Sequence, residues 1–372
     1  MLEGIRVIDF SQYLPGPHTT LRLSDLGAEV IKVESPLGDP ARGSLDENGA
    51  GYVFIAQNRN KKSIVLNLKD VKDQEIALNL ISEADIVLES FRPGVMDRLG
   101  IGYENAVRVK KDIIYCSLTG YGQTGIMSHL GGHDLNYLSL SGMLAQFKDG
   151  NGRPVQPSNT IADFVGGISA SESILAALVK RMKTGEGSYI DLSITDSLLS
   201  LMTNHVVIAK ATGEEHGVDR LNNKLVCYYL YETSDQRFVS LAALEPKFWY
   251  AFCKAVNKES WITAHLSLAQ EDNPVFEEMK MLFASKSFAE WSQFSLEVDC
   301  CLAPVLEASE VSNHPLTRDR GLIVQNGKST FALTNYHALR TDEQPAPEFG
   351  QHTEEIIAHF KGKVKGVNKN GF

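Results

Sequence analysis

The sequence contains few cysteines and no motif that would group them. Five cysteines occur in 372 residues, and none belongs to a CxxC pair. An odd number of cysteines without such pairs argues against a disulfide framework or a zinc site and favours reduced thiols. We therefore expect a cytoplasmic protein, and we expect no metal site.

The chain also lacks positive net charge and a long uninterrupted apolar run. Its formal net charge is −10, which argues against nucleic acid as the main partner. We find no apolar run long enough to cross a bilayer. Residues 1–17 lack the basic start and long apolar core of a signal peptide. We therefore expect neither a nucleic-acid partner nor a membrane partner.

Neither of the common phosphate-loop motifs is present. The glycine-rich stretch SLTGYGQTG at 117–125 lacks the order GxxxxGK[ST] and does not fit GxGxxG. Its glycines are better explained by a tight turn. These observations argue against a nucleotide hydrolase, and the lack of a fixed-period repeat argues against a solenoid.

The first third of the chain alternates strand and helix patterns. Short apolar runs typical of strands lie at 5–11, 28–34, 62–68, 85–90 and 112–118. Helical spacing between them predicts an α/β fold with a parallel sheet covered on both faces. Ligands in such sheets bind beyond the carboxyl ends of the strands. We therefore expect the stretches FSQYLPGP, ESFRPG and SLTGYGQTG to share one rim.

Changes of pattern along the chain indicate two domains and a tail. Residues 1–212 are expected to form a large domain with the parallel sheet. Residues 213–325 are expected to form a smaller α+β domain that begins with a hairpin-like pair at 228–244. Residues 326–372 are expected to form a C-terminal segment that returns to the large domain.

Basic side chains gather in the first third of this acidic chain. They are Arg42, then Arg59, Lys61 and Lys62, and finally Arg92 at the end of a strand. A run of charges is usually a solvated face. It can also form a pocket for a multiply phosphorylated ligand, because guanidinium groups grip phosphate oxygens. Both interpretations remain open from the residues alone.

Three ionisable residues are candidates for proton transfer. His133 lies in GGHDLNYLSLSG, and Asp163 lies at the start of a helical pattern at 163–182. Glu245 lies at a strand end before a proline. A structural histidine, a helix N-cap and an ordinary glutamate are the alternatives. An imidazole and a carboxylate can act together as base and conjugate acid. The spacing in the sequence does not bring these residues together.

Seven stretches, in order along the chain, carry a resemblance to a known family. They are LEGIRVIDFSQYLPGP, LGAEVIKVESPLGDPAR, NRNKKSIVLNLK, DIVLESFRPGVMDRLGIGYE, LTGYGQTG, GGHDLNYLSLSG and IADFVGG. The sequence resembles the family III CoA-transferase superfamily and, within it, the α-methylacyl-CoA racemase subgroup. The subgroup depends mostly on GHDLNYL, since transferase members typically have a non-histidine residue at the position of His133.

This resemblance implies a fold, a partner and a binding site. The implied fold is a Rossmann-like large domain with a smaller domain, and the implied assembly is a homodimer of interlocked chains. Arg42, Arg59 and Lys62 would hold the adenosine phosphates of CoA, and Arg92 would line the path of pantetheine and pyrophosphate. CoA would enter as the carrier of the acyl substrate, with no other cofactor.

The resemblance also implies a reaction. His133 and Asp163 would flank the acyl α-carbon, and Glu245 would support the histidine. The enzyme would invert the α-carbon of 2-methylacyl-CoA thioesters by two-base proton transfer through an enolate. If Asp163 opens the helix, free backbone N–H groups and the positive end of the helix dipole would lie beside the enolate oxygen, although the dipole would also weaken Asp163 as a base. The alternative is a CoA-transferase that moves CoA between carboxylic acids through an aspartyl-acyl anhydride at Asp163.

Overall fold

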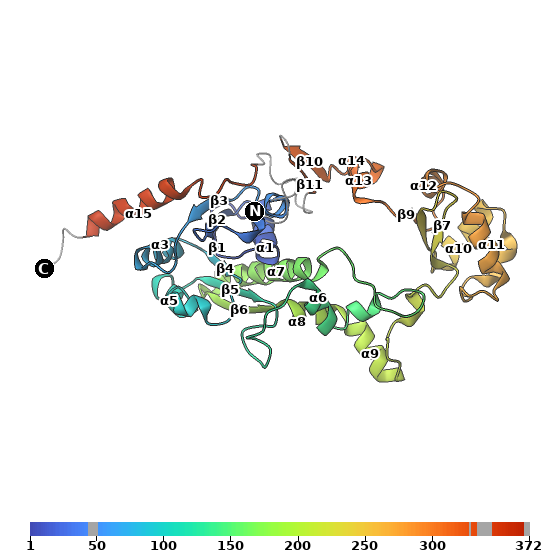
Figure 1. Cartoon of the computed structure of the whole chain (residues 1–372), viewed down its shortest axis with the longest axis horizontal. Helices are drawn as coiled ribbons and strands as arrows, with labels where there is room; N and C mark the ends of the chain where they lie inside the picture. The colour runs from blue at the N-terminus through green and yellow to red at the C-terminus, as the bar shows by residue number, and fades with distance from the viewer. Residues whose placement is uncertain (44–50, 327–328, 333–343, 368–372) are drawn as a thin grey trace. The chain divides into compact units, whose positions relative to one another are not determined.

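The chain divides into two compact units (Figure 1). The computed structural model describes residues 1–43, 51–326, 329–332 and 344–367. The first unit comprises Met1–Phe147, Pro154–Met202 and Arg320–Phe372, and the second comprises Lys148–Arg153 and Thr203–Asp319. Helix α9 (Thr203–Thr212) therefore belongs to the second unit, although we expected the large domain to extend to residue 212.

Six parallel strands form the sheet of the first unit, in the order β3-β2-β1-β4-β5-β6. Their bounds are β1 Arg6–Asp9, β2 Glu29–Glu34, β3 Lys62–Val65, β4 Ile86–Glu89, β5 Ile114–Thr119 and β6 Ser188–Ser193. The prediction of an α/β fold with a parallel sheet is confirmed. The strand order reverses between β1 and β4. A crevice for a ligand is expected at the carboxyl ends of the strands beside such a reversal.

Successive residues of the strands contribute their side chains to two apolar cores, one on each face of the sheet. Val7 and Leu88 belong to one core, whereas Ile8 and Val87 belong to the other. Successive side chains of a strand point to opposite faces, so a strand that is covered on both faces is apolar throughout. This is why the central strands β1, β4 and β5 read as nearly continuous apolar runs.

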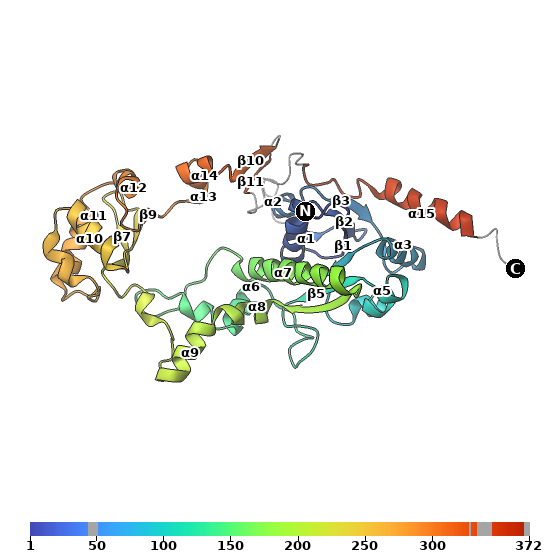
Figure 2. The ribbon, with the colours of Figure 1, turned by 180° about the vertical axis from the view of Figure 1, so that it is seen from behind.

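Helices cover both faces of this sheet (Figures 1 and 2). The first core contains Leu23 from α1 and Ile174 from α7. The second contains Leu80 from α3 and Phe360 from α15. The helices of this unit are α1 Pro15–Asp25, α2 Tyr52–Gln57, α3 Val71–Ser82, α4 Val95–Arg98, α5 Tyr103–Val109, α6 Asp134–Leu140, α7 Ile161–Thr184, α8 Ile194–Leu201 and α15 Thr353–Val367; short 3-10 turns lie at η1 Pro40–Arg42 and η2 Leu144–Gln146.

Helix α7 is the longest of these helices and lies close to its neighbours. A Cβ atom at Gly166 would lie 2.8 Å from Ile194 Cγ1, and one at Gly167 would lie 2.7 Å from the Pro15 carbonyl oxygen. Glycine therefore lets α8 and α1 approach the helix. By length and composition alone α7 could cross a membrane. Its place in the core of the first unit explains the same apolar composition without a membrane.

The second unit contains a three-stranded antiparallel sheet and an aromatic core. The expected hairpin is confirmed, since β7 (Tyr228–Glu232) pairs with β8 (Phe238–Ala242), and β9 (Leu302–Pro304) extends the sheet. The chain's three tryptophans are buried in this core. The other elements of this unit are η3 Asp219–Leu221, α10 Pro246–Ala255, η4 Glu259–Ala264, α11 Pro274–Phe283, α12 Phe288–Glu297, α13 Ala308–Val311 and α14 Pro315–Asp319.

The last part of the chain belongs to the first unit. Strands β10 (Ile323–Asn326) and β11 (Ser329–Ala332) form an antiparallel pair. Beyond it, the backbone N–H of His352 donates to the Ser63 carbonyl oxygen at 2.9 Å. The Val65 N–H donates to Thr353 Oγ1 at 3.1 Å. This segment thus covers the exposed edge of strand β3, which would otherwise present unpaired backbone groups.

Candidate active site

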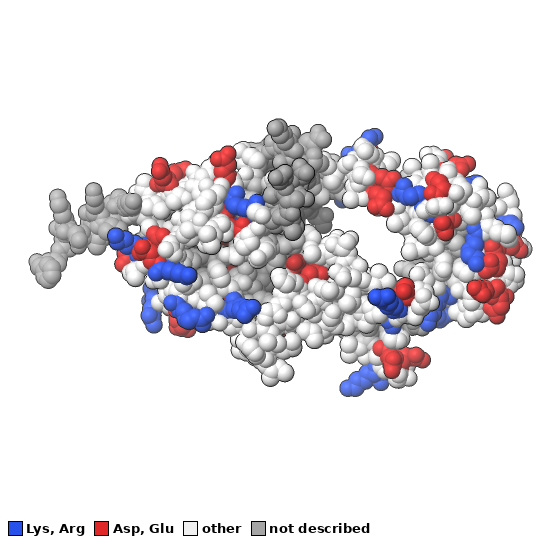
Figure 3. All heavy atoms as spheres, in the orientation of Figure 1, with Lys and Arg blue, Asp and Glu red and all other residues white. Residues whose placement is uncertain are grey.

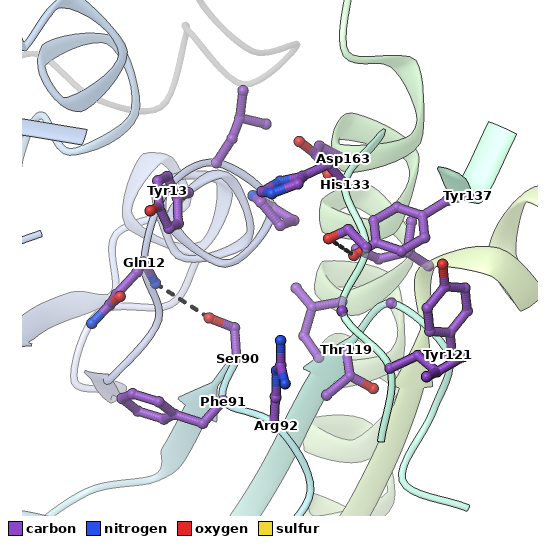
Figure 4. A pocket seen from close by; sticks show the side chains of 18 of the residues that line it. Gln12, Tyr13, Ser90, Phe91, Arg92, Thr119, Tyr121, His133, Tyr137 and Asp163 are labelled. Carbon is purple, nitrogen blue, oxygen red and sulfur yellow. Dashed lines mark hydrogen bonds between the residues drawn. The ribbon is translucent and has the colours of Figure 1, made fainter. Parts of the chain in front are cut away.

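A cavity of about 480 Å³ opens at the carboxyl ends of the strands in the first unit (Figure 4). Its walls include Gln12–Pro15 after β1, Ser90–Pro93 after β4 and Leu118–Tyr121 at the end of β5. These are the three stretches that we expected to share one rim, so this prediction is confirmed. The cavity lies beside the reversal of strand order, where α/β sheets bind ligands.

His133 lines this cavity at the start of α6. It is the residue that precedes the first turn of the helix, with an extended backbone (φ −129°, ψ 173°). Its backbone N–H donates to Asn136 Oδ1 at 3.0 Å, and its side chain is exposed. The residue therefore caps the helix through its backbone, and its imidazole is left beside the cavity.

Asp163 lines the same cavity from the first turn of α7. The helix begins at Ile161 after Thr160, so Asp163 is its third residue and not the N-cap. Burial, and secondarily the negative charge of Asp134, raise the pKa of Asp163 to about 7. A carboxyl group with this pKa is about half ionised at neutral pH. The structure thus brings together the two main candidates, His133 and Asp163, on one cavity (Figure 4).

Asp134 was not singled out from the sequence. Its carboxylate accepts hydrogen bonds from backbone N–H groups at the start of α7. The Asp163 N–H donates to Asp134 Oδ1 at 3.1 Å, and the Ala162 N–H also bonds to this carboxylate. The Phe164 N–H donates to the Thr160 carbonyl oxygen at 3.2 Å. Asp163 does not open the helix, and the Ala162 and Asp163 N–H groups are bonded to the Asp134 carboxylate, so these two groups are not free for an enolate oxygen.

Arg92 also lines the cavity, as expected. Its guanidinium lies close to the backbone at Gly131, where a Cβ atom would lie 2.8 Å from Arg92 Nη2. The side chain is exposed. An exposed guanidinium beside a cavity can bind phosphate or carboxylate oxygens of a ligand.

Two of the other expected phosphate ligands, Arg42 and Lys62, are held by carboxylates outside this cavity. Arg42 Nε and Nη2 donate to the Glu34 carboxylate at 2.7 and 2.8 Å, and the guanidinium lies over the Phe54 ring. Lys62 Nζ donates to Glu29 at 2.7 Å. Both side chains are only partly buried, so an anionic ligand could compete for them.

Arg59 and Lys61 do not form the solvated face that a charge run predicts. Arg59 is 1 % exposed, and both of its terminal nitrogens bond to the Asp25 carboxylate. Lys61 is buried, and its Nζ donates to the Pro17 carbonyl oxygen at 2.9 Å. A phosphate contact of Arg59 finds no support in this arrangement. The pair with Asp25 instead joins the end of α1 to the chain before β3.

We expect Arg59→Met to lower the free energy of unfolding by about 3–5 kcal/mol, because it leaves Asp25 buried without its main partner. Urea denaturation followed by circular dichroism measures this loss. Lys62→Met is the matched control, since its pair with Glu29 is partly exposed and worth about 0–1 kcal/mol. Equal losses in the two variants would contradict a special role for the buried pair.

Glu245 lies in the second unit, directly before α10. Its side chain is exposed and makes no capping hydrogen bond. Its negative charge contributes to raising the pKa of the Cys301 thiol, although burial is the larger cause. Support of His133 by Glu245 stays a prediction.

Comparisons with known proteins identify the family of this chain. Residues 2–353 match the family described as CoA-transferase family III. Human alpha-methylacyl-CoA racemase is 32 % identical over 96 % of this chain and 93 % of its own length. Mouse succinyl-CoA:glutarate CoA-transferase is 32 % identical over 100 % of this chain and 89 % of its own length.

A solved structure shows the same fold. The crystal structure of a CAIB/BAIF family protein from Brucella suis superposes with a TM-score of 0.84 at 24 % identity. The match covers 96 % of this chain and 98 % of that chain. The matched family spans nearly the whole chain and the relatives carry names of both racemases and transferases. The chain is therefore an enzyme that belongs to CoA-transferase family III.

Proposed function

We propose that this protein is a racemase that inverts the α-carbon of 2-methylacyl-CoA thioesters. The observation that supports this proposal most is the presence of His133 and Asp163 on one cavity. Inversion requires one group to remove the α-proton and another to return a proton to the opposite face. The thioester carbonyl carries the negative charge as an enolate between the two steps.

The pKa of Asp163 supports proton transfer. An ordinary aspartate is almost fully ionised at neutral pH and is a weak base. Burial raises the pKa of Asp163 to about 7. The group can therefore accept the α-proton of one substrate enantiomer and donate a proton when the other enantiomer reacts. General acid–base catalysis is most effective when the pKa lies near the working pH.

The carrier part of the substrate would begin in this cavity and extend beyond it. Arg92 lies on its wall, where its positive charge suits the path of pantetheine and pyrophosphate. Arg42 and Lys62 would bind the adenosine phosphates by exchanging Glu34 and Glu29 for phosphate oxygens. CoA serves here as substrate carrier, and the proposed reaction requires no further cofactor.

A CoA-transferase is the second candidate, because relatives with that name are as similar as the racemase. In this reaction an Asp163 oxygen attacks the thioester carbon and CoA leaves as a thiolate, which forms an aspartyl-acyl anhydride. The attacking carboxylate must be ionised. The raised pKa of Asp163 halves its ionised fraction near pH 7, which affects a nucleophile and a base alike. The aspartyl-acyl anhydride route as written uses no imidazole, whereas two-base inversion uses His133 on the cavity wall. The presence of His133 therefore favours the racemase.

We also propose a homodimer of interlocked chains. Five large apolar side chains are exposed on α7 and α8: Ile168, Val179, Met182, Leu199 and Leu201. Figure 3 shows the surface over α6 and α8 largely without charged side chains. Exposed apolar surface of this kind is typical of protein interfaces. Light scattering after size-exclusion chromatography should give twice the chain mass, and a monomer would contradict this part of the proposal.

The experiment that tests the proposed reaction is solvent exchange. The purified protein should replace the α-hydrogen of (2S)- and (2R)-2-methylacyl-CoA with deuterium from D₂O in the absence of any carboxylic acid. Mass spectrometry of the thioester measures the exchange. Transfer of CoA to an added acid, without α-exchange in its absence, would replace the racemase by the transferase.

We expect Asp134→Asn to shift the pH dependence of exchange. Removing the neighbouring negative charge lowers the pKa of Asp163, while the asparagine oxygen can still accept the Asp163 N–H. Exchange that needs ionised Asp163 should then begin at a lower pH than in the parent protein. Glu172→Gln, an exposed carboxylate on the same helix, is the control. A profile that stays in place, or moves to higher pH, would contradict the electrostatic role of Asp134.

A further inference from the structure

The glycines near His133 leave room for two tyrosines. A Cβ atom at Gly132 would lie 2.6 Å from the Tyr121 hydroxyl and 2.7 Å from Tyr137 Cε1. A Cβ atom at Gly120, after β5, would lie 2.3 Å from Tyr137 Cε1. The Tyr137 ring is therefore wedged between two backbone segments that both line the cavity (Figure 4).

The peptide bond between Gly132 and His133 is held at both of its polar ends. The Tyr137 hydroxyl donates to the Gly132 carbonyl oxygen at 2.6 Å. The His133 N–H donates to Asn136 Oδ1 at 3.0 Å. Both partners belong to the first turns of α6, so the helix fixes the peptide plane from which the imidazole extends. Tyr137 is itself only 7 % exposed, so its hydroxyl has little freedom to turn to solvent.

Tyr137 acts here as a fixed donor. Burial, and then the negative charge of Asp163, raise the pKa of Tyr137, so the hydroxyl keeps its proton at neutral pH. The side chain lines the same cavity as both proton-transfer candidates, His133 and Asp163, and its hydroxyl bonds to the Gly132 carbonyl oxygen, in the peptide that precedes His133.

We propose that Tyr137 is a positioning residue, which locks the Gly132–His133 peptide and so sets the direction from which the imidazole reaches the substrate. This inference rests on the proposed racemase function. Proton transfer requires hydrogen-bond geometry between donor and acceptor, and a small misplacement of a reacting group lowers the rate strongly. Loss of this positioning should therefore slow the reaction of the substrate enantiomer whose α-proton His133 removes.

The test is Tyr137→Phe, which keeps the ring and removes the hydroxyl. We expect deuterium exchange to fall about 10-fold or more for one hand of 2-methylacyl-CoA and to change less than about 3-fold for the other, with KM little affected. Gly132→Ala should give the same selective loss, because its Cβ meets both tyrosines. Tyr115→Phe and Gly150→Ala are the controls: the Tyr115 hydroxyl donates to the Ile101 carbonyl oxygen in the buried core, and a Cβ at Gly150 meets no atom within 4 Å.

Hydrogen exchange of the His133 backbone amide gives a second measurement that does not depend on catalysis. We expect this amide to exchange about 10-fold faster in Tyr137→Phe than in the parent protein, because the peptide is no longer held at its carbonyl. Equal losses of activity for both hands, or an unchanged amide, would overturn the positioning role. If the parent protein lacks α-exchange but the amide responds as expected, the proposed function fails while the structural lock stands.

Discussion

His133→Asn should lower the α-exchange of one hand of 2-methylacyl-CoA about 100- to 10,000-fold and leave that of the other hand nearly intact. In a two-base reaction each group removes the proton from one face only, so the loss of one group affects one hand first. Asparagine is suited to the position before a helix, and the native imidazole is exposed. The variant should therefore fold normally.

The measurement is deuterium uptake from D₂O into each pure hand of the substrate, with circular dichroism as the check on folding. Inversion should be lost for both hands, because neither can receive its proton on the opposite face. Exchange of the unaffected hand should return the starting configuration. Mild and equal losses for the two hands would reduce His133 to a helix cap.

Asp163→Asn should produce the complementary loss: the α-exchange of the other enantiomer should fall by a similar factor. It should also raise the thermal stability of the protein. The carboxyl is partly buried beside Asp134, and its pKa of about 7 means that the native state disfavours the ionised form. Asparagine has nearly the same shape and carries no charge.

The stability gain should depend on pH in a defined direction. Because the native pKa of Asp163 lies above its usual value of 3.8, ionisation destabilises the native state fully above about pH 7 and not at all below about pH 4. Asp163→Asn should therefore raise the midpoint of thermal unfolding at pH 8 and bring little gain at pH 4. Asp196→Asn, in the first turn of α8, is the control. An equal gain at both values of pH would contradict the assigned cause.

Much of the first unit could be predicted because its signals are local. The apolar runs around Val7 and Val87 show strands that are covered on both faces, and the rim follows from the rule that parallel strands end at one edge. This placed Arg92 and the β1, β4 and β5 loops on one cavity. The meeting of His133 and Asp163 came from the family resemblance, since no spacing rule joins the start of α6 to the start of α7.

The electrostatics of the site could not be read from the sequence. Asp134 stands next to His133 in the chain, but its effect on Asp163 depends on how α6 packs against α7. The cluster NRNKKS is typical of a solvated charge run, yet Arg59 is bonded to Asp25, the last residue of α1. In both cases a distant carboxylate decides the role of the residue. Such pairings follow from tertiary packing and leave no periodic signal.

The most direct test of the account is a crystal structure of the His133→Asn/Asp163→Asn double variant with a 2-methylacyl-CoA bound. Without its two acid–base groups the protein should hold the substrate unchanged. The account predicts that the α-carbon lies between residues 133 and 163, about 3–4 Å from each side chain and on opposite faces. An α-carbon outside the cavity, or both side chains on the same face, would contradict two-base inversion at this site.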